Sequence, residues 1–474
     1  MPVQKKIIYI ASFTAFALAL VCYNPFALYF QNDDFIHIPL SAEGKLLQHN
    51  SFRPVCDLSI MLDYFLWKKN AWGYHFTNLI LHVTACCIFY FFVQLLLKTY
   101  STVKDIRTTS WLVTVLFFIY AMHSEPVLWI LGRSAILATI FSLLCLYFYI
   151  KRNDGRYSFI LSQLFYVAGL LTYESVWALP AICVVIATTT LKQQHSTLKK
   201  EIVWLTIIFA TLALTLFIRG GFIHEVAGNY EVSYILNGNY LLLFKHYTLL
   251  FIRSFLPAFI NNPVLLAGYI CTIAFSILLF FKNRDRAMPV IILCFLLSLL
   301  PYITLGIDTN GTESERFLYF PTMVVCIMFA FLASHMADSV KMILFAALYA
   351  LHIITLFVVT PNYVVAGNIV QEISKAIKQL PDKKVILAAD VPQAQHGAFI
   401  FRQGLGEMIQ WLGEKKPDTV IICSQRYELL PLQYPYRIEK RNTGFIECNN
   451  NILNASADTL LLQFTDDALI IIQK

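Results

Sequence analysis

Charged residues are scarce in this sequence. Asp, Glu, Lys and Arg make up 14% of its 474 residues and hydrophobic side chains 58%, whereas soluble globular proteins carry about 25% charged residues. Because so few charges cannot provide a water-soluble surface, the composition predicts an integral membrane protein. The modest net charge of +7 comes from basic residues between apolar runs, a pattern typical of membrane topology rather than of nucleic-acid binding. We expect membrane lipids, and no nucleic acid, among the partners.

Several common functional motifs are also missing. The 11 cysteines include no Cys-x-x-Cys pair, so zinc and redox motifs are unsupported. Most of these thiols lie inside apolar runs, where they act as small hydrophobic side chains. Only Cys423 and Cys448, near the C-terminus, are expected to be able to form a disulfide. The C-terminal part also has no glycine-rich phosphate loop and no repeat period, which excludes a P-loop and a repeat array there.

Long apolar runs fill most of the chain up to residue 360. A membrane-spanning helix needs about 20 apolar residues, and the runs predict about 11 transmembrane helices in a mainly α, polytopic protein. They lie at 6–29, 74–97, 109–123, 133–150, 157–172, 175–191, 201–218, 263–281, 287–305, 316–334 and 341–360. The first run is too long for a cleaved signal peptide and is expected to remain as an anchor.

The loops between these runs predict the orientation. Cytoplasmic loops are rich in Lys and Arg, and the basic clusters all share one side if the N-terminus is cytoplasmic. The clusters lie at 5–6, 98–107, 151–156, 192–200 and 282–286. We place the apolar but charged segment 240–257 at the outer interface, because counting it as a span would move the last cluster outside. Four polar segments, 31–72, 123–133, 219–239 and 308–315, then converge on the outer face.

The composition changes near residue 362. A buried strand at 385–391, a helix at 399–412 and strands at 419–423, 460–464 and 469–472 are predicted from periodicity. We therefore expect a transmembrane domain at 1–361 and a small extracytoplasmic α/β domain at 362–474. No chemistry is predicted for this second domain.

The segment Asn32-Asp33-Asp34 follows the first apolar run directly. Two adjacent carboxylates at the mouth of a span are costly, because like charges repel and low dielectric penalises ionisation. Such a pair is typical of a proton acceptor or of a cation ligand. The alternative is a solvated helix cap just outside the bilayer.

Other polar residues recur at the outer ends of the runs. Glu125, after His123, is a second acidic group, and the guanidinium of Arg133 could bind two oxygens of a phosphate. Alternatively, Glu125 and Arg133 form an ion pair that closes a helical hairpin. His75, Asn78 and His82 share one helix face, which suits either metal ligation or interhelical hydrogen bonding. Glu174 suits a structural tie as well as a catalytic role. Arg316 lies at a helix N-terminus, where the helix dipole does not stabilise a cation. It is therefore expected to pair with an anion, either a lipid phosphate or Glu315.

In their order along the chain, these segments resemble the lipid-linked-sugar glycosyltransferases of the GT-C superfamily. The likeness is in particular to the protein O-mannosyltransferase branch, which includes transmembrane-and-TPR proteins and bacterial relatives. It covers residues 25–325 and consists of Asp33-Asp34, Arg53-Pro54, Gly73-Tyr74-His75 with Asn78 and His82, His123-Ser124-Glu125-Pro126-Val127 with Ile130, Gly132 and Arg133, Glu174 before Leu179-Pro180, and Glu315-Arg316-Phe317-Leu318-Tyr319-Phe320-Pro321. Each motif alone is weakly specific, whereas the ordered set is a strong signal.

The resemblance implies a GT-C-like helical bundle that transfers a sugar from a polyprenyl-phosphate donor to a protein, glycan or lipid acceptor. It implies that Asp34 or Asp33 is the catalytic base, and that Glu125 is the second acidic site residue. A divalent cation, Mg²⁺ or Mn²⁺, held by Asp33 and Glu125 is one way to steady the leaving phosphate; arginine is the other. The residues expected to bind substrate are Arg53, His75, Asn78, His123, Arg133, Glu174, Arg316 and Tyr319.

The chain departs from the family pattern at two positions and in its tail. Tyr173 stands where a lysine is usual before Glu174, and Tyr120 stands where a first histidine is usual before His123. The tail lacks TPR repeats, which favours a bacterial inner membrane. A non-catalytic transporter of lipid or sugar and a membrane assembly subunit are the alternatives. The absence of an inverted repeat and of charges at mid-span argues against a transporter.

Overall fold

The chain folds into two compact units in the computed structural model. The first comprises Met1–Asn24, Leu46–Ser59 and Phe76–Thr360, and the second Pro25–Lys45, Ile60–His75 and Pro361–Lys474. The last stretch of the second unit starts where the sequence places the domain boundary, but this unit also takes in two early segments. The structure describes residues 3–45, 52–101, 105–192, 196–223, 237–258, 262–283, 287–309, 311–426, 445–448, 451–454, 459–464 and 469–473.

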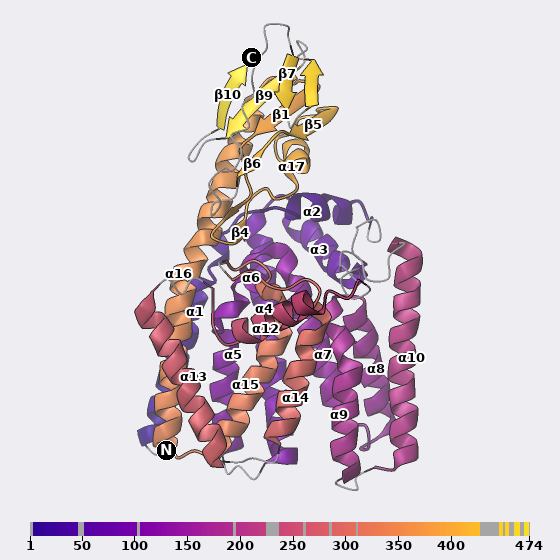
Figure 1. The fold of residues 1–474 in the computed structure, drawn as a ribbon, viewed down its shortest axis with the longest axis vertical. Helices are drawn as coiled ribbons and strands as arrows, with labels where there is room; N and C mark the ends of the chain where they lie inside the picture. The colour runs from indigo at the N-terminus through magenta and orange to yellow at the C-terminus, as the bar shows by residue number, and fades with distance from the viewer. Residues whose placement is uncertain are drawn as a thin grey trace. The chain divides into compact units, whose positions relative to one another are not determined.

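Helices build the first unit (Figure 1). They are α1 (Val3–Cys22), the start of α3 (Pro54–Trp67), most of α4 (Ala71–Tyr100), α5 (Ile106–Phe118), α6 (Ser124–Leu128), α7 (Arg133–Ile150), α8 (Arg156–Leu170), α9 (Leu179–Lys192), α10 (Leu198–Ile223), α12 (Tyr240–Arg253), α13 (Pro263–Asn283), α14 (Met288–Leu299), α15 (Tyr319–Ser334) and the first part of α16 (Asp338–Lys378). Short 3-10 turns precede several of them at the polar ends: η2 (Ala121–His123), η3 (Ile130–Gly132), η4 (Glu174–Ala178) and η6 (Glu315–Leu318).

The predicted mainly α, polytopic membrane fold is confirmed, with a correction to the number of full-length spans. Among the described residues, 8 helices are long and apolar enough to cross a membrane, or 9 if the bent pair formed by α5 and the segment Ala121–Leu128 counts as one span. The other two predicted spans correspond to shorter apolar helices, Tyr157–Leu170 and Met288–Tyr302. Tight turns at their ends shorten them relative to the apolar runs in the sequence.

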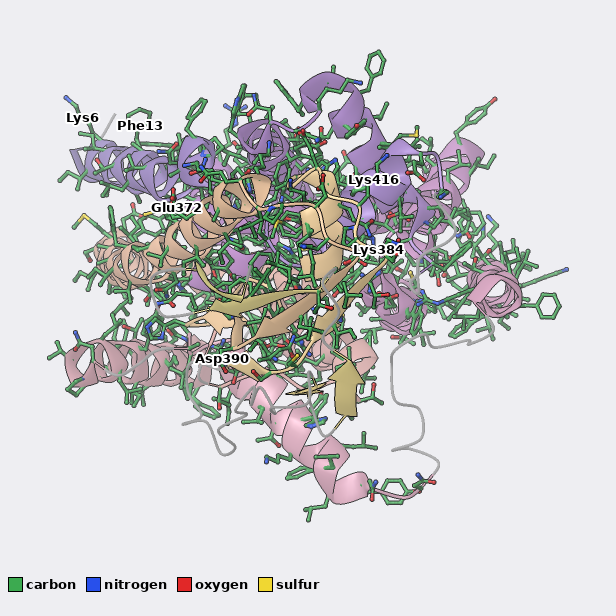
Figure 2. The ribbon with its side chains drawn as sticks, turned by 90° about the horizontal axis from the view of Figure 1, so that it is seen from above. Lys6, Phe13, Glu372, Lys384, Asp390 and Lys416 are labelled. Carbon is green, nitrogen blue, oxygen red and sulfur yellow. The ribbon has the colours of Figure 1, made fainter. Side chains whose placement is uncertain are left out.

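The packing separates inner from outer helices. Most of α7 and α15 is buried, whereas few residues of α10 and α13 are. Phe13 of α1, Phe217 of α10 and Leu278 of α13 are 67%, 80% and 68% exposed, and Figure 2 shows Phe13 pointing away from its helix. Large apolar side chains exposed on a helix face are what a lipid environment requires.

The second unit holds the small α/β region. Its four-stranded sheet has the order β10-β9-β1-β5, with β1 (Val385–Ala389) parallel to both β5 (Thr419–Ile422) and β9 (Thr459–Phe464), and β10 (Leu469–Gln473) antiparallel to β9. Lys384 and Lys416, labelled in Figure 2, lie just before the neighbouring strands β1 and β5. The predicted strands are thus confirmed, and the predicted helix is the shorter α17 (Leu405–Trp411).

Smaller elements complete this unit. They are η1 (Pro25–Ala27), α2 (Asp34–Ala42), the end of α3, the end of α16, β2 (Val391–Pro392) paired with β6 (Gln425–Arg426), β3 (Ala394–Gln395) paired with β4 (Ala398–Phe399), and β7 (Phe445–Cys448) paired with β8 (Asn451–Asn454). Cys423 is disulfide-bonded, whereas the side chain of its expected partner Cys448 lies outside the described residues.

A buried ion pair fastens α10 to the end of α7. Arg152 Nη2 lies 2.8 Å from Glu201 Oε1, and the two side chains are 0% and 2% exposed. Replacing Arg152 by Met should destabilise the folded protein by about 3–5 kcal/mol, because Glu201 would be left buried without its cation. Thermal inactivation in detergent measures the effect.

The double variant R152M/E201L should regain most of the loss, since it buries no charge. Lys375→Met serves as a control, because Lys375 and Glu372 form an exposed pair of the kind that contributes about 0–1 kcal/mol. Equal stability of R152M and K375M would contradict the stabilising role of the Arg152–Glu201 ion pair.

Candidate active site

Residues 121–132, which we call the Glu125 turn, connect two buried segments of the first unit at a bend in the chain. The helical axis turns by 55° between α5 and the segment Ala121–Leu128, and Asn78 Nδ2 donates to the carbonyl of Trp129 at 2.8 Å. Gly132 lies at the end of the turn, where only glycine fits. A Cβ at this position would lie 2.6 Å from the carbonyl oxygen of Glu125. The glycine near the end of the motif therefore has a steric cause.

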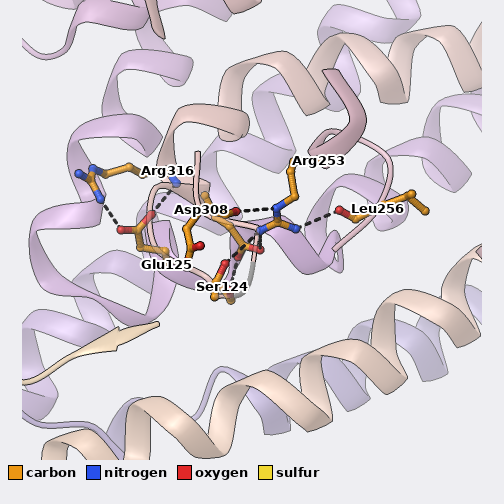
Figure 3. A network of polar contacts seen from close by, with 8 residues as sticks. Ser124, Glu125, Arg253, Leu256, Asp308 and Arg316 are labelled. Atoms are coloured by element: carbon orange, nitrogen blue, oxygen red, sulfur yellow. Dashed lines mark hydrogen bonds and ion pairs between the residues drawn. The ribbon is translucent and has the colours of Figure 1, made fainter. Parts of the chain in front are cut away.

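Glu125 is fully buried and both of its oxygens accept from Arg316 (Figure 3). The Arg316 backbone N–H donates to Oε2 at 2.7 Å, and its Nη1 donates to Oε1. Arg316 is thus the partner of Glu125, in place of the Arg133 that the sequence offered. The guanidinium also lies over the rings of Trp129 and Phe317, at 5.3 and 4.8 Å from their centroids.

Glu315 belongs to a second buried cluster, whose members Ser124 and Arg253 are labelled in Figure 3. Its Oε2 accepts from Ser124 Oγ at 2.7 Å, and its Oε1 pairs with Arg253 Nη2 at 2.9 Å. Arg253, at the end of α12, also donates to the carbonyls of Asp308 and Leu256 at 3.1 and 2.9 Å. These bonds tie α12 and the 308–316 loop to the Glu125 turn.

Glu174 carries the third buried carboxylate and joins two arginines. Its Oε2 lies 2.9 Å from Arg53 Nη2 and its Oε1 lies 2.8 Å from Arg219 Nη2, with the Glu174 side chain 0% exposed. Glu174, Arg53 and Arg219 thus form a charged triad. Arg219 is nearly buried, whereas Arg53 is 26% exposed, so Arg53 is the arginine of the triad that a ligand can reach.

Tyr173 lies among these charges. The Arg53 guanidinium stacks 4.5 Å from the centroid of its ring. Burial raises the pKa of Tyr173 to about 12, and the nearby positive charges of Arg316 and Arg53 oppose this shift. The phenol therefore stays neutral at physiological pH. Arg53 and Arg316, which are 26% and 21% exposed, thus both act electrostatically on Tyr173.

The histidines and Arg133 occupy different positions. His82 contacts the Tyr319 hydroxyl at 2.6 Å and the Phe118 carbonyl at 2.9 Å, and His123 contacts Thr322 Oγ1 at 2.8 Å. Both histidines are fully buried, and His82 makes the interhelical hydrogen bonds that the sequence offered as an alternative. Arg133 is also fully buried, and its Nε donates to the Ile130 carbonyl at 3.2 Å.

The acidic pair and His75 belong to the second unit. Asp34 opens α2 fully buried, and its Oδ2 accepts the Gln31 backbone N–H at 2.9 Å. Asp33 precedes the helix and is partly exposed. His75 Nε2 contacts the Tyr29 carbonyl at 3.2 Å. Of the two carboxylates, Asp33 is therefore the more accessible.

The expected metal site finds little support in its donor set. Both Glu125 oxygens are occupied by Arg316, and a cation would have to displace a guanidinium to reach them. Across the described ranges, no group of three or more His, Cys, Asp or Glu side chains is placed to hold a metal ion. We therefore derive no step through a metal.

Sequence reasoning missed two of the cations in this site. Arg219 and Arg253 appeared only as loop or interface residues, although an arginine at the outer end of a span calls for an anion. Their carboxylates are Glu174 and Glu315, far away in sequence and invisible to spacing. At the two departures from the family pattern, Tyr120 donates to the Ser254 carbonyl at 2.8 Å and Tyr173 stacks with Arg53.

The helices define a polytopic, mainly helical membrane fold. The structure is similar to the crystal structure of ArnT from Cupriavidus metallidurans bound to undecaprenyl phosphate, with a TM-score of 0.50 over 88% of this chain and 89% of that one, at 10% sequence identity. At this identity the likeness concerns the fold alone. No family model matches the chain.

In sequence, the chain is similar to protein O-mannosyl-transferases, which confirms the expected resemblance. It is 24% identical over 323 residues to one from Caenorhabditis elegans, covering 62% of this chain and 44% of that protein. It is 34% identical over 117 residues to TMTC2 of Homo sapiens, covering 24% of this chain and 13% of that protein. The chain thus matches less than half the length of these relatives.

The steric role of Gly132 gives a test of the site. Gly132→Ala should destabilise the Glu125 turn by about 1–3 kcal/mol, because the new methyl group overpacks against backbone atoms. The melting temperature of the purified protein measures this loss. Gly221→Ala, where nothing lies within 4 Å of the added Cβ, is the matched control and should not melt lower. Equal melting of both variants would refute the close approach.

Proposed function

We propose that this protein is a glycosyltransferase that moves a sugar from a polyprenyl-phosphate donor to an acceptor hydroxyl on the extracytoplasmic side of a membrane. The observation that carries the proposal is the pair of partly exposed arginines, Arg53 and Arg316, held by buried glutamates around Tyr173. The names of the relatives and the undecaprenyl phosphate named for the ArnT structure support the same class of reaction and donor.

Arg53 and Arg316 suit a phosphate group. A guanidinium presents several N–H donors in a fork that matches phosphate oxygens. Glu174 and Glu125 fix the two forks before a ligand arrives, so little side-chain entropy remains to be lost on binding. As the sugar–phosphate bond breaks, negative charge grows on the phosphate oxygens, and positioned cations stabilise that charge most in the transition state.

The reaction needs a base for the acceptor hydroxyl, and we assign this role to Asp33. The acceptor oxygen attacks the anomeric carbon while the bond from that carbon to the phosphate oxygen breaks. The bonding electrons leave with the polyprenyl phosphate, the hydroxyl proton passes to the carboxylate, and the configuration inverts. Asp33 is favoured over Asp34 because its side chain is partly exposed, whereas Asp34 accepts a hydrogen bond from its own loop.

A protein acceptor and mannose are the substrates suggested by the relatives' names. The disulfide at Cys423 supports an extracytoplasmic C-terminal region, because disulfides persist in oxidising compartments. The basic clusters support a cytoplasmic N-terminus. We propose a bacterial inner membrane as the location.

The first test concerns the phosphate. Arg53→Lys and Arg316→Lys keep the charge beside each glutamate but lose the fork geometry, so each should lower kcat/KM for the donor about 10-fold or more. The measurement is the release of lipid phosphate from radiolabelled polyprenyl-phosphate sugars by the purified protein. Arg107→Lys, at an exposed position, should behave as wild type. Unchanged kinetics in both site variants would count against the phosphate assignment.

The second test separates the two aspartates and the alternative functions. Asp33→Asn should lower kcat by about 10²–10⁴-fold, because the carboxylate that accepts the proton is lost while the side chain keeps its size. Asp34→Asn should instead reduce stability and affect kcat less. If the protein were a transporter or an assembly subunit, neither substitution would change the result of the same sugar-transfer assay. Loss of transfer in D34N alone would move the base to Asp34.

A further inference from the structure

A loop of the C-terminal domain grips the residue that precedes the acidic pair. The backbone N–H of Asn32 donates to the Ile400 carbonyl at 2.9 Å, and the Gln403 N–H donates to Asn32 Oδ1 at 2.8 Å. All of these groups belong to the second unit. Asn32 is only 2% exposed, so its amide and its side chain depend on these partners in place of water.

The backbone of Asn32 has a conformation that fixes the direction of the next residues. Its φ is 49°, in the left-handed region, which asparagine tolerates better than most residues. The chain then turns directly into α2, with the Phe35 N–H donating to the Asn32 carbonyl at 3.2 Å. A change at Asn32 would therefore redirect Asp33 and Asp34, which follow immediately.

Gly404 lets the loop approach this closely. Its φ of +82° is one that side-chain-bearing residues rarely adopt, and a Cβ there would lie 2.6 Å from the Asn32 carbonyl oxygen. The glycine is thus required twice, for its backbone angle and for its contact. Gly406, two residues later in α17, offers a contrast, because its Cβ would meet only Val420 at 3.6 Å.

Aromatic packing continues the same contact on both sides of Asn32. The Phe35 ring stacks on Phe401 with centroids 6.0 Å apart, and the Phe30 ring packs edge-on against Trp411 at 5.0 Å. Next to Asn32, Gln31 Nε2 donates to the Tyr363 carbonyl at 2.8 Å. The segment 30–35 is therefore held at the backbone and at four side chains by residues beyond 360.

We infer that the 400–404 loop is a positioning element for the acidic pair, so that the C-terminal domain is part of the catalytic apparatus. The inference rests on the proposed function, because it assigns a base to Asp33. Misplacement of a reacting group by about 1 Å can cost about 100-fold in rate. A loosened loop should therefore lower kcat while leaving the KM for the lipid donor unchanged, since the proposed phosphate ligands lie in the other unit.

Gly404→Ala against Gly406→Ala tests this in the full-length protein. G404A should lower kcat by about 10-fold or more at unchanged donor KM, and should accelerate amide hydrogen exchange in residues 32–36. G406A should match wild type in both measurements. Equal kcat in the two variants would overturn the inference, whatever the exchange data show. A parallel rise in KM and fall in kcat would indicate general damage and would also overturn it.

Asn32→Gly covers the case in which G404A does not fold. Glycine keeps the positive φ of residue 32, and the variant removes only the acceptor for the Gln403 N–H. Asn32→Gly should also lower kcat and accelerate hydrogen exchange, but less than G404A does. If even the wild-type protein transfers no sugar from any polyprenyl-phosphate donor, the proposed function fails. Hydrogen exchange still reads the grip on Asn32 in that case, so the two failures are distinguishable.

Discussion

The first unit depends on the pairing of buried carboxylates. Glu125, Glu174 and Glu315 are at most 1% exposed, and an ionised carboxylate in low dielectric is stable only with a cation and hydrogen bonds around it. Arg316, Arg53 with Arg219, and Arg253 supply those cations. Because each partner comes from a different part of the chain, the pairs hold distant segments of the first unit together. At the ends of these short helices, the ion pairs replace the water that would otherwise solvate the charged groups.

The same pairing explains how a binding site can be stable before its ligand arrives. A lone arginine exposed to a lipid phosphate would be mobile and strongly hydrated. Here Arg53 and Arg316 are each anchored by a buried oxygen and flattened against aromatic rings, with about a quarter of the side chain still accessible. Preorganised cations cost little reorganisation when charge develops on a bound phosphate.

The apolar runs and the order of the motifs made the helical fold and most candidate residues predictable. Composition reports burial in lipid directly, and strand periodicity located β1, β5, β9 and β10. The partners were not predictable, because ion pairs such as Arg53 with Glu174 join residues 121 apart and leave no local pattern. For the same reason Arg133 looked like a phosphate ligand from its place in the motif, whereas the structure buries it completely. Spacing says which residues share a turn, not which way the turn faces.

The second unit shows the same limit in its most extreme form. The hydrogen bond between Asn32 and Gln403 joins residues 371 apart, so the acidic loop and the domain that holds it are separated by nearly the whole chain. Closing such a contact costs loop entropy, and no local sequence pattern records it. The position of the acidic loop therefore could not be predicted from the segment around it. A tail that carried no chemistry of its own in the sequence is, on this argument, what gives the acidic pair a defined position.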